Sequence, residues 1–118
     1  LEGTQELAII EPLNGMAKKG VQSHISKLFN YTSKRQYLFI VVYDYGVSNR
    51  LNERWKKYLD DTLLSHTYPK GYELINNSIN DITEELGFKN DALRVAMTNH
   101  GTDTELYHII ANINYKAQ

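Results

Sequence analysis

The sequence predicts an α/β fold with a central mixed β-sheet flanked by helices, and three observations carry this prediction. The opening third has the pattern of a strand, an amphipathic helix and a second strand, over residues 4–12, 18–32 and 36–45. A helix between two strands permits a parallel pair joined by a right-handed crossover. Residues 92–99 and 104–115 alternate around a turn-rich loop, which is typical of an antiparallel hairpin. The expected order is therefore β-α-β-α-β-(α)-β-β, with this hairpin at the C-terminal end.

The first strand is expected over residues 4–12, which are apolar along most of their length. We expect Pro12 to stop its pairing, because proline has no amide hydrogen. The strand would then end in the carboxylate of Glu11. The helix that follows, over residues 18–32, places its apolar side chains on one face at helical spacing. These are Val21, Ile25, Leu28, Phe29 and Thr32.

The strand expected over residues 36–45 is dense in β-branched and aromatic residues. Because its apolar run is continuous, we expect both of its faces to be covered. A second helix is expected over residues 50–65, where Leu51, Trp55, Leu59 and Leu63 recur every fourth residue. Residues 72–75 then predict a short strand. Residues 76–90 predict either a short helix or a loop packed by its own apolar side chains.

Length and composition predict one globular domain over residues 1–118, with 42% hydrophobic and 23% charged residues. No apolar run approaches the roughly 20 residues that a membrane helix needs. The net charge of −1 gives no support for a basic nucleic-acid-binding stripe. The absence of cysteine excludes disulfides, thiolate zinc sites and cysteine nucleophiles, and it fits a cytoplasmic protein. Because the chain starts at Leu1, we expect a fragment or terminal domain of a longer protein, whose other domains would be partners.

Two consecutive segments carry a resemblance to a known family. Residues 6–15 read E-L-A-I-I-E-P-L-N-G, and residues 21–31 read V-Q-S-H-I-S-K-L-F-N-Y. They resemble the core of the PD-(D/E)XK, or restriction-endonuclease-like, superfamily. In that family a strand ends in the E-x-K half of the motif, and the next helix often carries Q/H-I-x-K-L-x-x-Y. Residues 37–44, 52–58 and 106–110 are similar to one branch, the nuclease-like domains at the ends of large bacterial proteins, several with ATPase modules and some linked to defence against phage.

The resemblance implies metal-dependent hydrolysis of phosphodiester bonds in DNA or RNA. A Mg²⁺ ion held by carboxylate oxygens would polarise the phosphate and activate a water molecule, with a lysine assisting. Glu11 would be the main metal ligand, Glu6 a second ligand, and Lys18 or Lys19 the lysine. Glu6 and Glu11 would need a bulge between them to share a metal, since residues five apart on a strand point to opposite faces.

Two departures from the family pattern leave an alternative open. The lysine expected two residues after Glu11 is Leu13, and no aspartate precedes Glu11 in the sequence. The same fold could therefore serve as a catalytically inactive interaction module, or as a small standalone immunity or regulatory protein.

Four histidines complete the set of candidate residues. His24, on the first helix, could contact phosphate or a metal-bound water, and its structural alternative is a hydrogen bond from the helix to the sheet. We expect His108 to pack within its strand and His100 to lie in the hairpin loop beside Asp103. His66 is expected at a helix end, where its positive charge would suit the helix dipole.

Overall fold

The computed structural model describes residues 8–31 and 37–116, and its centre is a five-stranded mixed sheet. The spatial order is β1-β2-β5-β4-β3. The first three strands of that order run parallel, and β4 is antiparallel to both of its neighbours. The mixed sheet, the parallel opening pair and the closing hairpin are therefore confirmed. The strands are β1 (Ala8–Asn14), β2 (Tyr37–Asp44), β3 (Asn80–Asp81), β4 (Leu93–His100) and β5 (Thr104–Asn112).

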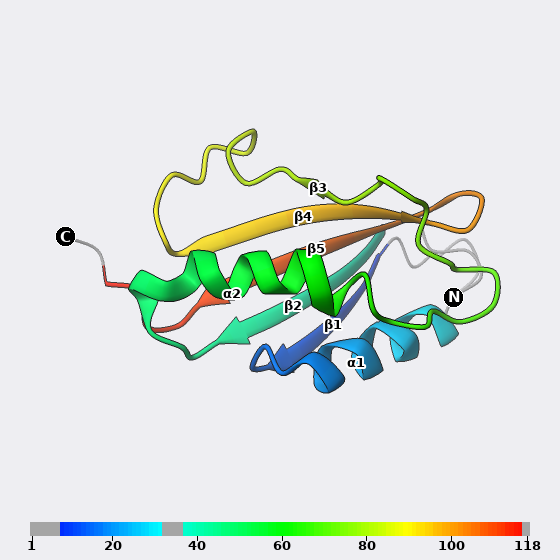
Figure 1. The fold of residues 1–118 in the computed structure, drawn as a ribbon, viewed down its shortest axis with the longest axis horizontal. Coiled ribbons are helices and arrows are strands. Elements are labelled where there is room, and N and C mark those ends of the chain that lie inside the picture. The colour runs from blue at the N-terminus through cyan, green and yellow to red at the C-terminus, as the bar shows by residue number, and fades with distance from the viewer. Residues whose placement is uncertain (1–7, 32–36, 117–118) are drawn as a thin grey trace, which may run out of the picture.

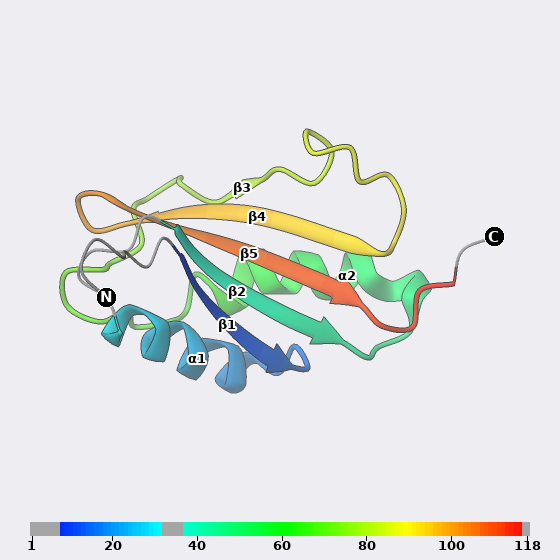
Figure 2. The same cartoon turned by 180° about the vertical axis from the view of Figure 1, so that it is seen from behind.

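Two helical segments cover one face of the sheet (Figures 1 and 2). The first is α1 (Lys18–Asn30). The second is α2 (Leu51–Lys57), which a 3₁₀ turn, Ser48–Arg50, precedes and a π-helical turn, Tyr58–Thr62, continues. The second helical segment therefore covers most of the region predicted over residues 50–65, but it ends at Thr62 and changes its hydrogen-bonding pattern along its length.

The core lies between these helices and the sheet. The apolar face of α1 meets alternate residues of β2 and β5, because side chains of a strand alternate between its two faces. Trp55 is 5% exposed and belongs to this core, as its helical spacing predicts. The buried apolar residues of α1, β2, α2 and β5 form one continuous cluster: Val21, Ile25, Leu28, Phe29, Leu38, Ile40, Val42, Leu51, Trp55, Leu106 and Ile110.

Among the described residues, no helix covers the opposite face of the sheet, so the expectation that both faces of β2 are covered was wrong (Figure 2). Leu38, Ile40 and Val42 point to the helices and are buried, whereas Tyr37 and Tyr43 are exposed. The apolar run of β2 is continuous because its second face is also apolar, although no second helical layer of residues 8–31 and 37–116 covers that face. We call this surface the open sheet face. Its larger apolar residues are Ile10, Tyr37, Phe39, Val41, Tyr43, Leu93, Val95, Met97, Tyr107 and Ile109.

Three further expectations need correction. Pro12 does not stop β1, which pairs with β2 as far as Asn14, because β1 is an edge strand and proline is tolerated there. The predicted strand at 72–75 is reduced to a single bridge between Leu74 and His100. Of the two alternatives for residues 76–90, the helix is wrong and the loop describes them better, since they contain turns and, in addition, the two-residue strand β3. Among the described residues, no helix combines the length and the apolar character that crossing a membrane requires.

Candidate functional site

Glu11 lies in the middle of β1 and not at its end as predicted. Its register partner on β2 is Ile40, which faces the helices. The side chain of Glu11 therefore points beneath α1, and the residue is only 8% exposed. A carboxylate at this depth needs hydrogen-bonding or ionic partners, because its burial is otherwise costly.

Helix α1 supplies those partners from two residues on one of its faces. Nδ1 of His24 lies 2.8 Å from Oε1 of Glu11, and Nζ of Lys27 lies 3.5 Å from the same oxygen. His24 and Lys27 are three residues apart, which places them side by side on the helix. The negative charge of Glu11, with a smaller contribution from Tyr31, raises the pKa of Lys27. The Lys27 ammonium also lies 5.9 Å from the centre of the Tyr31 ring.

The structure brings together some of the predicted site residues and separates others. Glu11 and His24 are in contact, and this contact is the hydrogen bond from the helix to the sheet that was the structural alternative for His24. Lys18 instead forms an ion pair with Asp61 at 3.1 Å, and Lys19 is exposed at the start of the helix. The lysine near Glu11 is Lys27, which the sequence reasoning missed. The sequence could have indicated Lys27, because it follows His24 by about one helical turn and therefore lies on the same side of the helix.

The described residues around Glu11 do not form a magnesium site. Mg²⁺ prefers an octahedron of oxygen ligands, and here one carboxylate faces an imidazole and an ammonium group. No cluster of three or more His, Cys, Asp or Glu side chains occurs among residues 8–31 and 37–116. Leu13 packs against the core in the place of the expected lysine. Glu6, the predicted second ligand, lies outside the described residues.

The other histidines are structural. His108 packs in its strand as predicted and is fully buried. His100 is the last residue of β4 and is also fully buried, so its expected place in the hairpin loop was wrong. Both contact the hydroxyl of Thr98, at 2.6 Å for His100 and 2.8 Å for His108. Burial lowers the pKa of His100 to about 4 and that of His108 to about 3.

His66 does not place a charge at a helix end. The helical segment stops at Thr62, and Nε2 of His66 lies 2.8 Å from the hydroxyl of Ser26. Partial burial lowers the pKa of His66, which disfavours the protonated form that the helix dipole would have stabilised.

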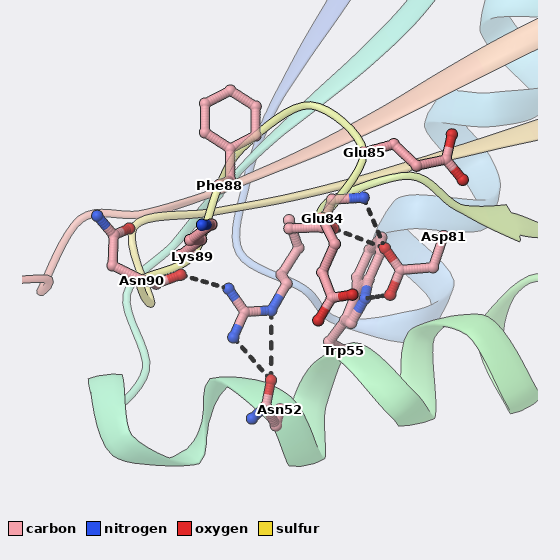
Figure 3. A pocket seen from close by; sticks show the side chains of 10 residues that line it. Asn52, Trp55, Asp81, Glu84, Glu85, Phe88, Lys89 and Asn90 are labelled. Carbon is pink, nitrogen blue, oxygen red and sulfur yellow. Dashed lines mark hydrogen bonds between the residues drawn. The ribbon is translucent and has the colours of Figure 1, made fainter.

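A polar hollow between α2 and residues 81–90 is closed by its own hydrogen bonds (Figure 3). Nε1 of Trp55 donates to Asp81 at 2.9 Å, and the buried guanidinium of Arg94 donates to Asn52 at 2.7 Å and to the carbonyl of Asn90 at 2.7 Å. Burial on its own would raise the pKa of Asp81, but hydrogen bonds from Thr83 and Trp55 outweigh it and lower the pKa. The buried polar groups therefore satisfy one another.

The open sheet face is an apolar surface that the helices of the described residues leave uncovered. Ile10 is 60% exposed, Tyr37 48% and Tyr43 36%. Where residues 82–88 fold over the sheet, they form an apolar groove of about 430 Å³ on this face. Its walls include Phe39, Tyr107, Ile109, Ile82, Leu86 and Phe88.

Comparison with protein-family models, with curated proteins and with solved structures found no match to this chain. Two features of the chain therefore carry the inference of function. One is the open sheet face, and the other is the group formed by Glu11, His24 and Lys27, which we call the Glu11 cluster.

Proposed function

We propose that this chain is an interaction module on an α/β scaffold, which binds a protein partner through the open sheet face. One observation carries the proposal: a sheet with helices on one face presents on its other face a broad set of aliphatic and aromatic side chains. A contiguous exposed apolar patch of this kind is typical of an interaction site. Tyrosines at the margins fit such a surface, because they combine apolar area with a hydroxyl that can stay hydrated.

The Glu11 cluster is consistent with a binding module. Glu11 is engaged by two residues of α1, so its charge is used to hold the helix against the edge strand. Leu13, two residues on, belongs to the packed interior. A carboxylate with these neighbours has a sufficient structural role without catalysis.

The proposal is tested by photo-crosslinking in the cells that produce the protein. A photoreactive amino acid replaces Tyr43 on the open sheet face. In a matched control it replaces Leu64, which follows the second helical segment and is an apolar residue with 60% exposure. We expect adducts of discrete mass from position 43 and not from position 64. Adducts from neither position, or equally from both, would contradict the proposal.

A metal-dependent nuclease acting on DNA or RNA is the second candidate function, and the convergence of Glu11, His24 and Lys27 favours it. An ionised carboxylate only accepts hydrogen bonds, so in the neutral form of His24 the proton would lie on Nδ1 and Nε2 would have a lone pair to accept another. His24 could then act as a general base, while the half-exposed Lys27 ammonium could bind a phosphate group. The metal that the family resemblance implies would need ligands beyond the described residues.

The nuclease candidate is tested by incubating the protein with single-stranded and double-stranded DNA and RNA in Mg²⁺ or Mn²⁺. If it hydrolyses them, Glu11→Gln should abolish cleavage, whereas Glu53→Gln on the exposed side of α2 should not. Cleavage that survives Glu11→Gln would remove the Glu11 cluster from the mechanism. Absence of cleavage with every substrate would leave the interaction module as the functional model.

A further inference from the structure

We propose that the partner of the open sheet face is the same face of a second copy of this chain, in a two-fold symmetric dimer. This inference rests on the proposed function and names the partner for it. In the proposed arrangement the two-fold axis runs along the strands between β2 and β5. Ile10 of each copy then packs on β4 of the other copy, above Met97 and beside the apolar groove.

The width of the surface favours a sheet as its occupant. Its apolar residues extend from β1 across β2 and β5 to β4, and the groove continues them to residues 82–88. Four strands about 4.8 Å apart and about eight residues long make a face of roughly 19 by 26 Å. A single helix about 10 Å across would cover half of that width. A second sheet of equal size would cover all of it, and stacked sheets pack about 10 Å apart.

The area reaches the lower end of the range that specific interfaces bury, about 1,000 Å² in total for both partners. The flat projection above is roughly 500 Å², to which the relief of the side chains and the 82–88 segment adds. Standard protein interfaces bury about 800 Å² on each partner. The open sheet face therefore approaches the standard size only if almost all of it is covered, which a second copy of the same face would do.

Charge also favours self-association. A two-fold interface places the same patch against itself, so any charge in its centre would meet an identical charge. The four long strands contribute one charged residue to this face, Glu105, and it lies at the exposed start of β5, near the margin. The centre of the face, around Phe39 and Ile109, is uncharged. Like-charge repulsion between two copies is therefore absent from the region that would be desolvated.

The edge strand and the groove lie at neighbouring positions on this face. Ile10 stands on the edge strand at 60% exposure. In the sheet register Ile10 is level with Phe39, Tyr107 and Met97, of which Phe39 and Tyr107 line the groove. Rotation about an axis along the strands keeps this level and reverses the strand order. It therefore brings β1 of one copy over β4 of the other, with Ile10 above Met97 and beside the groove.

The mass in solution gives the first test, by sedimentation equilibrium over a range of concentrations. We expect twice the 13.6 kDa of the chain. Ile10→Asp should raise the dissociation constant at least about tenfold, because it would bury an unpaired carboxylate against the apolar surface of β4 in the other copy. Leu64→Asp is the matched control, since Leu64 is also apolar and 60% exposed, and it should leave the dimer unchanged. A monomer at all concentrations, or equal weakening by both variants, would overturn the inference.

Cysteine cross-linking tests the arrangement, because the chain has no cysteine of its own. Ile10→Cys and Met97→Cys proteins are mixed and oxidised. We expect disulfides between the two variants to exceed those that either forms with itself, since the proposed axis places Ile10 of one copy above Met97 of the other. Preferential self-linking of Ile10→Cys would require a different axis and would overturn the arrangement.

The two proposals fail in distinguishable ways. A monomer in solution whose position 43 still forms discrete adducts with another protein overturns the dimer and supports the interaction module. A monomer without such adducts contradicts both.

Discussion

The hydroxyl of Tyr58 lies 2.8 Å from Nδ1 of His108, at one end of a buried hydrogen-bonded chain with a single direction. At the other end, Nδ1 of His100 lies 3.1 Å from the carbonyl oxygen of Tyr72, which can only accept. His100 therefore donates there and accepts from the hydroxyl of Thr98 through Nε2. Thr98 in turn accepts from Nε2 of His108, whose Nδ1 accepts from Tyr58. Each neutral histidine thus uses both ring nitrogens, and protonation of either would break a buried hydrogen bond.

This buried series of hydrogen bonds predicts that the protein loses stability in mild acid. The pKa values of His100 and His108 in the folded state, about 4 and about 3, lie below the ordinary value of 6.5. Below pH 6.5 the unfolded chain therefore takes up protons that the folded chain refuses. The contribution of the two neutral histidines to the free energy of unfolding is fully present above pH 6.5 and is lost as the pH falls towards 4. Between pH 7.5 and pH 5 we expect a loss of about 2 kcal/mol for each histidine.

Urea unfolding at pH 7.5, 6.0 and 5.0 measures this effect. The midpoint should fall steadily through the series, and His108→Phe should make the fall shallower even if it lowers stability at pH 7.5. A free energy of unfolding that stays level from pH 7.5 to pH 5 would show that the two histidines do not stay neutral in the fold.

Two adjacent valines on β2 should differ in their effect on stability. Val42 faces the helices and is 0% exposed, whereas Val41 lies on the open sheet face. Val42→Ala should cost about 2 kcal/mol by leaving a cavity, and Val41→Ala less than about 1 kcal/mol. Leu28→Ala, also in the core, should cost about 3 kcal/mol. Chemical denaturation in an Ile10→Asp background removes any contribution of a dimer to Val41, and equal losses at both valines would contradict a sheet covered on one face.

Two glycines with positive φ should respond differently to alanine. Gly101 in the β4–β5 hairpin has a φ of 59°, and a Cβ there would collide with the backbone carbonyl of Gly71. Gly87 has a φ of 88° and open space around it. Gly87→Ala should therefore cost only the conformational strain, about 1 kcal/mol. Gly101→Ala should cost clearly more in thermal or chemical unfolding, because strain and collision add. The reverse order would indicate that residues 71 and 101 are not in contact.

The ion pair between Glu11 and Lys27 should be visible in the titration of the lysine. Glu11 is the largest cause that raises the pKa of Lys27, so Glu11→Gln should lower that pKa towards 10.5. NMR titration of the Lys27 side-chain carbon next to the ammonium group measures it. Glu53→Gln, on the exposed side of α2, should leave the value unchanged. An unaltered pKa in Glu11→Gln would mean that the two groups do not interact in solution.

The sequence by itself determined the features that depend on local patterning. Helical spacing from Val21 to Phe29 and alternation from Leu93 to Met97 are repeated within one element, so they predicted α1, β4 and the mixed sheet. The pattern was uninformative where an element is short. The two-residue strand β3 exists because Asn80 and Asp81 pair with β4, and no propensity within residues 76–90 indicated it.

Tertiary structure decided which surfaces meet. The apolar run of β2 is the same whether one face or two are covered, because a strand's sequence records that a side chain is apolar and not what lies above it. Pro12 remains in a strand because β1 is at the edge of the sheet. The lysine that pairs with Glu11 is Lys27 and not Lys18, because α1 lies along β1 with its later turns over the middle of the strand. Such pairings depend on the position of one element against another, which no periodicity within either element specifies.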